Sequence, residues 1–324
     1  MNKQNPLVSI CSLAYNHEPF IRQCLDGFMM QNTNFPFEVL IHDDASTDGT
    51  ADIIREYEAK YPDIIKPIYQ TENQYSKGCD ICSNYLFSRA KGKYIALCEG
   101  DDYWTDPYKL QRQVDFLEAH EVASMCFHDA KKIDLIGNKK GDFRRYNKDQ
   151  YASVENLIVG GGGFCPTASL VFRTQCISDY PDFCKNCFVG DYPLQLYLSF
   201  KGKIYYFDNK MSIYRKGVPN SFTQTYSKID YSIRIEKMID TFKMLDGINA
   251  LFNYKYSSVI LQHQIDIIIG NLALAINTLK YENIILVTRA FGKYIKNLKV
   301  RNRIKIVFAA IMHSIFKLFQ KFFI

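Results

Sequence analysis

Two adjacent carboxylates directly after an apolar run have the clearest potential for chemistry. The run at residues 94–97 (Tyr-Ile-Ala-Leu) leads through Cys-Glu-Gly into Asp101 and Asp102. Successive residues of an extended chain point to opposite faces, so we expect the two aspartates to do different jobs. One carboxylate can ligate a hard divalent cation that also holds nucleotide phosphates, while the other contacts a sugar hydroxyl. The alternative is that the pair caps a helix predicted over residues 106–120, because aspartate is a favoured capping residue.

A second acid pair, Asp43-Asp44, follows the strand predicted at residues 37–42. A carboxylate accepts a hydrogen bond from an imide N–H, which uracil and thymine possess, so Asp44 is a candidate for reading a nucleobase. The alternative is that Asp44, or Asp48 after it, caps the next helix. The first strand is followed by Tyr-Asn-His-Glu at residues 15–18, without a Gly-x-Gly-x-x-Gly motif, and the chain has no P-loop. This disfavours dinucleotide and triphosphate-cradle sites.

The elements that must position these acids alternate between strand and helix. Apolar runs predict strands at residues 7–14, 37–42, 64–69 and 93–97, and helical spacing predicts helices at residues 18–30, 50–61 and 79–90. Such βαβ alternation predicts an α/β fold with a mainly parallel, doubly wound sheet. Ligands of these sheets bind outside the carboxyl ends of the strands, where both acid pairs fall.

The composition is that of an ordinary globular chain. Its 324 residues are 47% hydrophobic and 23% charged, which allows one large domain or two of ordinary size. The net charge of +6 is uneven, because nine Lys/Arg and no acid follow Glu282, leaving the first 282 residues at about −3. No signal peptide pattern opens the chain, so we expect a cytoplasmic protein.

Ten cysteines are expected to be reduced thiols in that compartment. Two Cys-x-x-Cys pairs, at residues 79–82 and 184–187, raise the alternative of a structural zinc site. About a hundred residues separate the pairs and the first lies in a predicted helix, both of which disfavour zinc.

The ordered set of these motifs resembles the family-two inverting glycosyltransferases of the GT-A (nucleotide-diphospho-sugar transferase) fold. The resemblance covers about residues 5–220 and rests on residues 8–16, 38–50 and 90–104. It implies that Asp102 ligates Mn²⁺ or Mg²⁺ as part of an Asp-x-Asp-like motif, here written Glu-Gly-Asp-Asp. It also implies nucleotide-sugar contacts by Ala14, Tyr15, Asn16, Asp44, Lys77 and Asp101, with Asp44 at the base and Lys77 near the diphosphate.

The second half of the chain is expected to supply the acceptor side. A glycine run at residues 160–163 permits close backbone approach to a ligand, or is a mobile connection. Asp191 opens a predicted helix, and the resemblance implies that it is the catalytic base. The alternative is an N-cap, with which Pro193 agrees, and the two roles can coexist because a carboxylate has two oxygens. Arg215 follows predicted strands at residues 203–207 and 211–214 and is a candidate diphosphate ligand.

These residues predict a metal-dependent inverting glycosyltransferase of the bacterial cell-surface glycan type. The sugar moves from a nucleotide-diphosphate donor, expected to be a UDP-sugar, to a hydroxyl of a glycan or lipid-linked acceptor. The cation stabilises the leaving diphosphate, and Asp191 removes the acceptor proton in a single displacement. One alternative is a nucleotidyltransferase, which would need a glycine-rich basic loop after the first strand. The other is a non-catalytic sugar-nucleotide-binding scaffold, against which the retained acids argue.

We expect a glycosyltransferase domain over residues 1–225 and a helical C-terminal region over residues 226–324. Its predicted helices are residues 229–245, 254–279 and 282–298, and polar residues within 259–276 favour a buried helix over a membrane span. A final basic amphipathic helix around residues 303–322 predicts peripheral binding to the inner face of the cell membrane. The alternative is that this helix docks on its own domain or on a second subunit of a homo-oligomer. Nucleic acid is not expected, because no recognition motif accompanies the charge.

Overall fold

The computed structural model describes residues 5–78, 80–277 and 281–292. The chain divides into two compact units, Met1–Ser221 and Phe222–Ile324. The boundary predicted from the sequence, after residue 225, lies four residues beyond this division.

The first unit is built on a ten-stranded sheet with the order β3-β2-β1-β4-β9-β6-β10-β5, in which β7 pairs with β6 and β8 with β10. The strands are β1 Val8–Ala14, β2 Phe37–Asp43, β3 Ile65–Tyr69, β4 Tyr94–Leu97, β5 Tyr103–Trp104, β6 Ala123–Ile133, β7 Lys139–Asp142, β8 Gln150–Ala152, β9 Val171–Arg173 and β10 Lys203–Arg215. Strands β1 to β4, β6 and β10 run in one direction, and the short strands β5, β7, β8 and β9 run against them. The predicted mainly parallel α/β sheet is confirmed.

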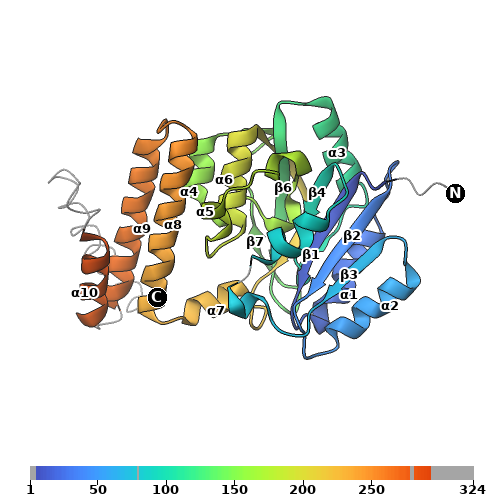
Figure 1. Cartoon of the computed structure of the whole chain (residues 1–324), viewed down its shortest axis with the longest axis horizontal. Coiled ribbons are helices and arrows are strands. Elements are labelled where there is room, and N and C mark those ends of the chain that lie inside the picture. Colours follow the sequence, from blue (N-terminus) through green and yellow to red (C-terminus); the bar gives the residue numbers. More distant parts are fainter. Residues whose placement is uncertain (1–4, 79, 278–280, 293–324) are drawn as a thin grey trace. The chain divides into compact units, whose positions relative to one another are not determined.

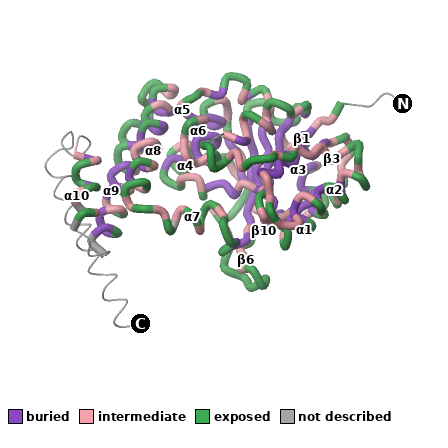
Figure 2. The backbone as a smooth tube through the Cα atoms, turned by 60° about the horizontal axis from the view of Figure 1, so that its bottom comes forward, coloured by how far each residue is buried: buried purple, intermediate pink, exposed green. Residues whose placement is uncertain are grey.

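The α-helices of this unit connect the strands. They are α1 Glu18–Met29, α2 Thr50–Lys60, α3 Lys109–Ala119, α4 Val154–Gly160, α5 Asp182–Lys185 and α6 Asp191–Lys201. Helix α1 forms because its apolar residues recur at helical spacing, which buries Ile21, Leu25 and Phe28 in the core shared with β1 and β2. The Phe28 ring packs edge-on against Trp104 at 4.9 Å between centroids. Figure 1 shows α1 and α2 beside β1, β2 and β3, and Figure 2 shows that β1 is almost entirely buried.

The acidic residues lie at the carboxyl ends of the central strands. In the parallel ladders Ala14 is paired with Asp43 and Cys11 with Leu97, so the carboxyl ends of β2, β1 and β4 lie side by side. The turns that follow these three strands are held together by backbone hydrogen bonds. The Asp44 N–H donates to the Ala14 carbonyl oxygen at 2.9 Å, and the Gly100 N–H donates to the Leu13 carbonyl oxygen at 2.8 Å. Both predicted acid pairs therefore lie at the same carboxyl ends of the strands.

Three sequence predictions about elements are wrong in detail. The helix predicted at residues 79–90 is a π-helical turn over Cys82–Leu86 followed by a 3₁₀ turn over Phe87–Arg89. The two strands predicted within residues 203–214 are one strand, β10, with a bulge between Phe207 and Lys210. Helix α3 begins at Lys109 rather than residue 106, and its first turn is preceded by Asp106, whose Oδ1 accepts the Tyr108 N–H at 2.8 Å. Asp101 and Asp102 are therefore not the caps of that helix.

The second unit is helical and has its own apolar core. Its described helices are α7 Phe222–Lys228, α8 Tyr231–Leu251, α9 Ser257–Asn277 and α10 Tyr281–Ala290. The core is formed by residues of α8, α9 and α10 that include Phe242, Ile268 and Val287. Among the described residues one helix segment, Ser257–Ala275, has the length and composition of a membrane span, with a mean hydropathy of 1.3 and 39% of its residues buried. The predicted final basic helix lies outside the described residues.

Candidate active site

Three carboxylates gather in the turn after β4. Glu99, Asp101 and Asp102 each offer one oxygen within 4.8 Å of the other two, and this is the one such group of possible metal ligands among the residues that the structure describes. The turn is tight because Gly100 has no side chain. A Cβ there would lie 2.9 Å from His17 Nδ1 and 3.0 Å from the Leu13 carbonyl oxygen.

Crowding and burial change the ionisation of this group. Asp102 is 2% exposed, and burial, followed by the charge of Asp101, raises its pKa well above the ordinary value. Burial also raises the pKa of Glu99 to about 8, with further contributions from Asp101 and Asp191. Since Asp191 acts on Glu99, the acid that opens α6 lies within electrostatic reach of the turn after β4.

Arg215 holds the acid turn from the end of β10. Its backbone N–H donates to Asp102 Oδ1 at 2.8 Å, and its guanidinium donates to the Asp101 carbonyl oxygen and to Gln23 Oε1. The guanidinium also lies over the Tyr103 ring at 4.6 Å. Arg215 is only 7% exposed, and its observed contacts are to the acid turn itself. The predicted contact of Arg215 with a diphosphate stays a prediction.

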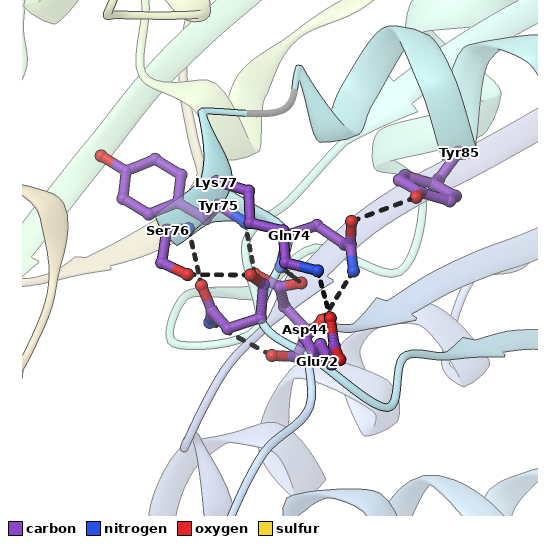
Figure 3. Close-up of polar contacts among 8 residues, drawn as sticks. Asp44, Glu72, Gln74, Tyr75, Ser76, Lys77 and Tyr85 are labelled. Carbon is purple, nitrogen blue, oxygen red and sulfur yellow. Dashed lines mark hydrogen bonds and ion pairs between the residues drawn. The ribbon is translucent and has the colours of Figure 1, made fainter.

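Asp44 is buried at the end of β2, where both of its carboxylate oxygens are occupied by backbone donors. Oδ1 accepts the Gln74 N–H at 2.7 Å and Oδ2 accepts the Tyr75 N–H at 3.0 Å, as Figure 3 shows. The carboxylate thus caps the 3₁₀ turn Tyr75–Lys77. The alternative that Asp44 caps α2 is wrong, because Asp44 caps the turn Tyr75–Lys77 instead. At the start of α2 it is Asp48 that accepts the Thr50 N–H. Each Asp44 oxygen keeps a second lone pair for a ligand.

The three predicted donor-site residues after β1 lie against this turn. Asn16 has a left-handed backbone with φ 54°, and its Oδ1 accepts the Thr47 N–H at 2.8 Å. Ala14 is buried and supplies the carbonyl that the Asp44 N–H bonds, whereas Tyr15 is 37% exposed. The partly exposed Tyr15 therefore follows directly on the residue whose carbonyl bonds Asp44.

Lys77 is placed less favourably for the predicted diphosphate contact. Its ammonium is paired with the Glu72 carboxylate, and both side chains are more than half exposed (Figure 3). An exposed ion pair of this kind is weak, so a phosphate could replace Glu72 as the partner of Lys77.

Asp191 is the first residue of α6, and Gly190 occupies the N-cap position. Its carboxylate is half-buried, and burial raises its pKa, opposed by the N–H groups of Tyr192 and of Asp191 itself. The carboxylate lies against Gly162 of the glycine run, where a Cβ would come 2.6 Å from Asp191 Oδ1. The run therefore approaches Asp191 closely at Gly162, and the predicted approach to a ligand stays a prediction.

Sequence reasoning missed two residues of this site. Glu99 belongs to the acid group, and the available signal was its acid-x-acid spacing to Asp101. His17 follows β1 directly, its Nδ1 is buried without a hydrogen-bond partner, and it interacts electrostatically with Asp101 and Asp48. Burial lowers the His17 pKa. The signal for His17 was its place in the Tyr-Asn-His run after the first strand.

The cysteine pairs do not form a metal cluster among the described residues. Cys184 is buried and Cys187 is partly buried, and Cys79 lies outside the described residues. The acid turn is therefore the metal-ligating group that the described chain offers.

Comparisons with known proteins identify the family to which the chain belongs. Residues 9–177 match the model of the family described as glycosyl transferase family 2. An uncharacterised protein of Mycobacterium tuberculosis is 39% identical over 222 residues, which are 68% of this chain and 62% of that protein, so the chain spans about 62% of the length of such a relative. The UDP-Glc:α-D-GlcNAc-diphosphoundecaprenol β-1,3-glucosyltransferase WfaP of Escherichia coli is 37% identical over 116 residues, 36% of this chain and 43% of WfaP.

The fold is also found among solved structures. The structure of Staphylococcus aureus TarS residues 1–349 in complex with UDP-GlcNAc matches with a TM-score of 0.61 at 16% identity, covering 95% of this chain and 89% of that one. This match supports the GT-A arrangement predicted from the sequence.

Proposed function

Because the chain belongs to glycosyl transferase family 2, we propose that it is a metal-dependent inverting glycosyltransferase that uses a nucleotide-diphosphate sugar. One observation carries this proposal. Three carboxylates from the turn after β4 meet within 4.8 Å, and Asp191, about ninety residues further along the chain, lies close enough to raise the pKa of one of them. A cation-binding group beside a separate carboxylate is what a sugar transfer with a diphosphate leaving group needs.

The residues of the acid turn fit a hard divalent cation such as Mn²⁺ or Mg²⁺. All of the available ligand atoms of Glu99, Asp101 and Asp102 are carboxylate oxygens, which such ions prefer. Burial, and after it the charges of the neighbouring acids, raises the pKa values of Glu99 and Asp102, so a bound cation would stabilise their ionised forms. When bound, the cation would supply Lewis-acid stabilisation of the departing diphosphate.

The chain's own residues then act on the acceptor. In the proposed mechanism the Asp191 carboxylate takes the proton of an acceptor hydroxyl as that oxygen attacks the anomeric carbon from the face opposite the diphosphate. The raised pKa of Asp191 makes its carboxylate a stronger base. A single displacement inverts the anomeric configuration.

The donor side is proposed to lie between the turns after β1 and β2. A free lone pair of Asp44 would accept an imide N–H, and the exposed Tyr15 ring would contact the base. A UDP-sugar is supported by the donor in the name of WfaP and by the UDP-GlcNAc in the TarS structure. Asn16, Asp101, Lys77 and Arg215 are the further donor contacts that we propose.

The name of one relative supports a proposal for the acceptor and for the cellular location. The name of WfaP specifies a lipid-diphosphate acceptor, which supports a glycan or lipid-linked acceptor and a role in polysaccharide synthesis for this chain. We propose action at the cytoplasmic face of the membrane.

Cation-dependent donor binding tests the proposal. With Mn²⁺ and UDP-sugars, we expect a rise in melting temperature and release of UDP in the wild type, both lost in Asp102→Asn. Asp115→Asn is the matched control, because Asp115 is an exposed acid of α3 that pairs with Gln111. Equal Mn²⁺-dependent shifts in wild type and Asp102→Asn would contradict the metal assignment.

A further inference from the structure

The loop that directly follows α4, residues 161–165, is fixed to α6 by a buried glutamine. Gln195 is fully buried, its Nε2 donates to the carbonyl oxygens of Gly162 at 3.0 Å and Cys165 at 3.2 Å, and its Oε1 accepts the Cys165 N–H at 3.4 Å. Gln195 lies one helical turn after Asp191, so both side chains project from the same face of α6. The glutamine therefore sets the distance between the loop and the face that carries Asp191.

Arg145 also holds this loop through hydrogen bonds. Its guanidinium donates to the carbonyl oxygens of Phe164, at 2.7 Å, and Gly163, and it lies over the Phe164 ring at 5.2 Å. In addition, the Tyr192 hydroxyl donates to the Ile158 carbonyl oxygen at 2.6 Å and ties the end of α4 to α6. The loop is thus restrained by hydrogen bonds to several of its backbone carbonyls.

Gly162 and Gly163 of this loop have different surroundings. A Cβ at Gly162 would lie 2.6 Å from Asp191 Oδ1, 3.0 Å from Oδ2 and 3.0 Å from Cγ, whereas a Cβ at Gly163 would meet nothing within 4 Å. Neither residue has a positive φ, so alanine is compatible with the backbone at both positions. Gly162 therefore matters for the space that the Asp191 carboxylate occupies rather than for a turn conformation.

From these contacts we infer that Gly162 and Gln195 are positioning residues that aim the Asp191 carboxylate at the acceptor hydroxyl. This inference rests on the proposed role of Asp191 as the base. Gln195 fixes the loop, the loop places Gly162, and the absent side chain of Gly162 leaves one position for the carboxylate. Misplacement of a reacting group by about 1 Å costs on the order of a hundredfold in rate.

Comparing Gly162→Ala with Gly163→Ala in the full-length protein tests the inference. We expect kcat to fall about a hundredfold in Gly162→Ala, with the KM of the UDP-sugar and the melting temperature unchanged, because the Cβ displaces only the end of a side chain. Gly163→Ala should retain wild-type kcat. Equal kcat values in the two variants would overturn the inference.

A double-mutant cycle separates positioning from a general structural effect. If Gly162 acts through Asp191, adding Gly162→Ala to Asp191→Asn should cause no further loss, whereas independent effects would multiply. Gln195→Met, which keeps the side-chain volume but removes the three hydrogen bonds, should also lower kcat and show the same lack of additivity if it folds. Multiplying effects would overturn the inference, and wild-type transfer by Asp191→Asn would instead reject the proposed base.

Discussion

At the scale of single residues, burial decides the ionisation of the groups that matter. Glu99 and Asp102 sit in a turn from which water is largely excluded, so both carboxyl groups hold protons more tightly than in water. Arg215 donates its backbone N–H to Asp102 and its guanidinium to a carbonyl oxygen, which leaves the carboxylates themselves for a cation. In the proposed mechanism a divalent cation supplies the positive charge that would favour their ionised forms.

Lys109 shows the same effect with the opposite sign. Its side chain is fully buried under the Trp104 ring, with Nζ 4.0 Å from the ring centroid and 2.8 Å from Gln113 Oε1. Burial lowers the Lys109 pKa to about 7. Between about pH 7 and the ordinary lysine value, the unfolded state therefore binds more protons than the folded state.

This residue predicts a pH-dependent stability. Because the folded pKa is depressed, the contribution of Lys109 to the free energy of unfolding should rise as the pH increases above 7, with a limiting slope of about 1.4 kcal/mol per pH unit, whereas the raised pKa values of Glu99 and Asp102 act in the opposite direction. Below pH 7 the cost of burying the charge is fully present. Lys109→Met should lack this rise, which urea unfolding at pH 7.0 and pH 8.5 would measure. A wild-type increase no larger than that of Lys109→Met would contradict the assignment.

The sequence was most informative about residues that come directly after apolar runs. Asp44 and Asp102 are predicted there, and both are buried at the carboxyl ends of parallel strands. Glu99, which lies in the same turn as Asp102, and His17, three residues after β1, were missed because strand alternation does not describe which side chains a turn brings together. The partner of each acid, such as the Gln74 N–H on Asp44, depends on tertiary packing that no local pattern contains.

At the scale of elements, the segment after β3 is shaped by a single carboxylate. Asp44 accepts two consecutive backbone N–H groups at the start of the 3₁₀ turn Tyr75–Lys77, and the Asn73 side chain returns a hydrogen bond to the Asp44 carbonyl oxygen at 3.2 Å. Figure 3 shows this turn standing over Asp44. The proposed donor contact of Asp44 would therefore be coupled to the order of this turn.

Replacing Asp44 should loosen that turn. In Asp44→Ala the amides of Gln74 and Tyr75 lose their acceptor, which costs about 1–3 kcal/mol, and their hydrogen exchange should accelerate accordingly. The KM for the UDP-sugar should rise at the same time. Asp52→Ala, at an exposed ion pair in the first turn of α2, is the control. Unchanged exchange at the two amides would show that the carboxylate does not hold the turn.

The regular elements were predictable where burial follows a simple period. Strands β1 to β4 and helix α1 agree with the sequence prediction to within one or two residues, because β1, β2 and β4 bury continuous runs and α1 buries a helical stripe, although β3 buries only Ile65. Residues 80–89 follow no such pattern. There the chain forms wider and narrower helical turns, and apolar spacing does not distinguish these from an α-helix.

At the scale of the whole molecule, each compact unit contains its own core. The core of the first unit includes Ile10, Ile41 and Ala96 of the central strands, and that of the second unit includes Phe242 and Ile268. All of the residues proposed for the donor, the cation and the base belong to the first unit. The sequence could predict this division from the change to a helical pattern, but not what the second unit does.

Truncation tests this division. A chain ending at residue 225 should fold and keep the Mn²⁺-dependent melting shift with a UDP-sugar, because the proposed donor residues and their core are retained. Transfer to a lipid-linked acceptor, measured beside the full-length chain, would show whether the second unit serves the acceptor. A truncated chain that is folded by circular dichroism but binds no donor would contradict the proposed domain boundary.

The most direct test of the account is the rate of sugar transfer by Asp191→Asn under saturating donor. Asp182→Asn is the control, since Asp182 is an exposed acid of α5 paired with Lys185. The account predicts that Asp191→Asn binds the UDP-sugar and Mn²⁺ as the wild type does, and that its transfer rate falls by on the order of 10²–10⁴, while Asp182→Asn transfers normally. Transfer at the wild-type rate by Asp191→Asn would contradict it.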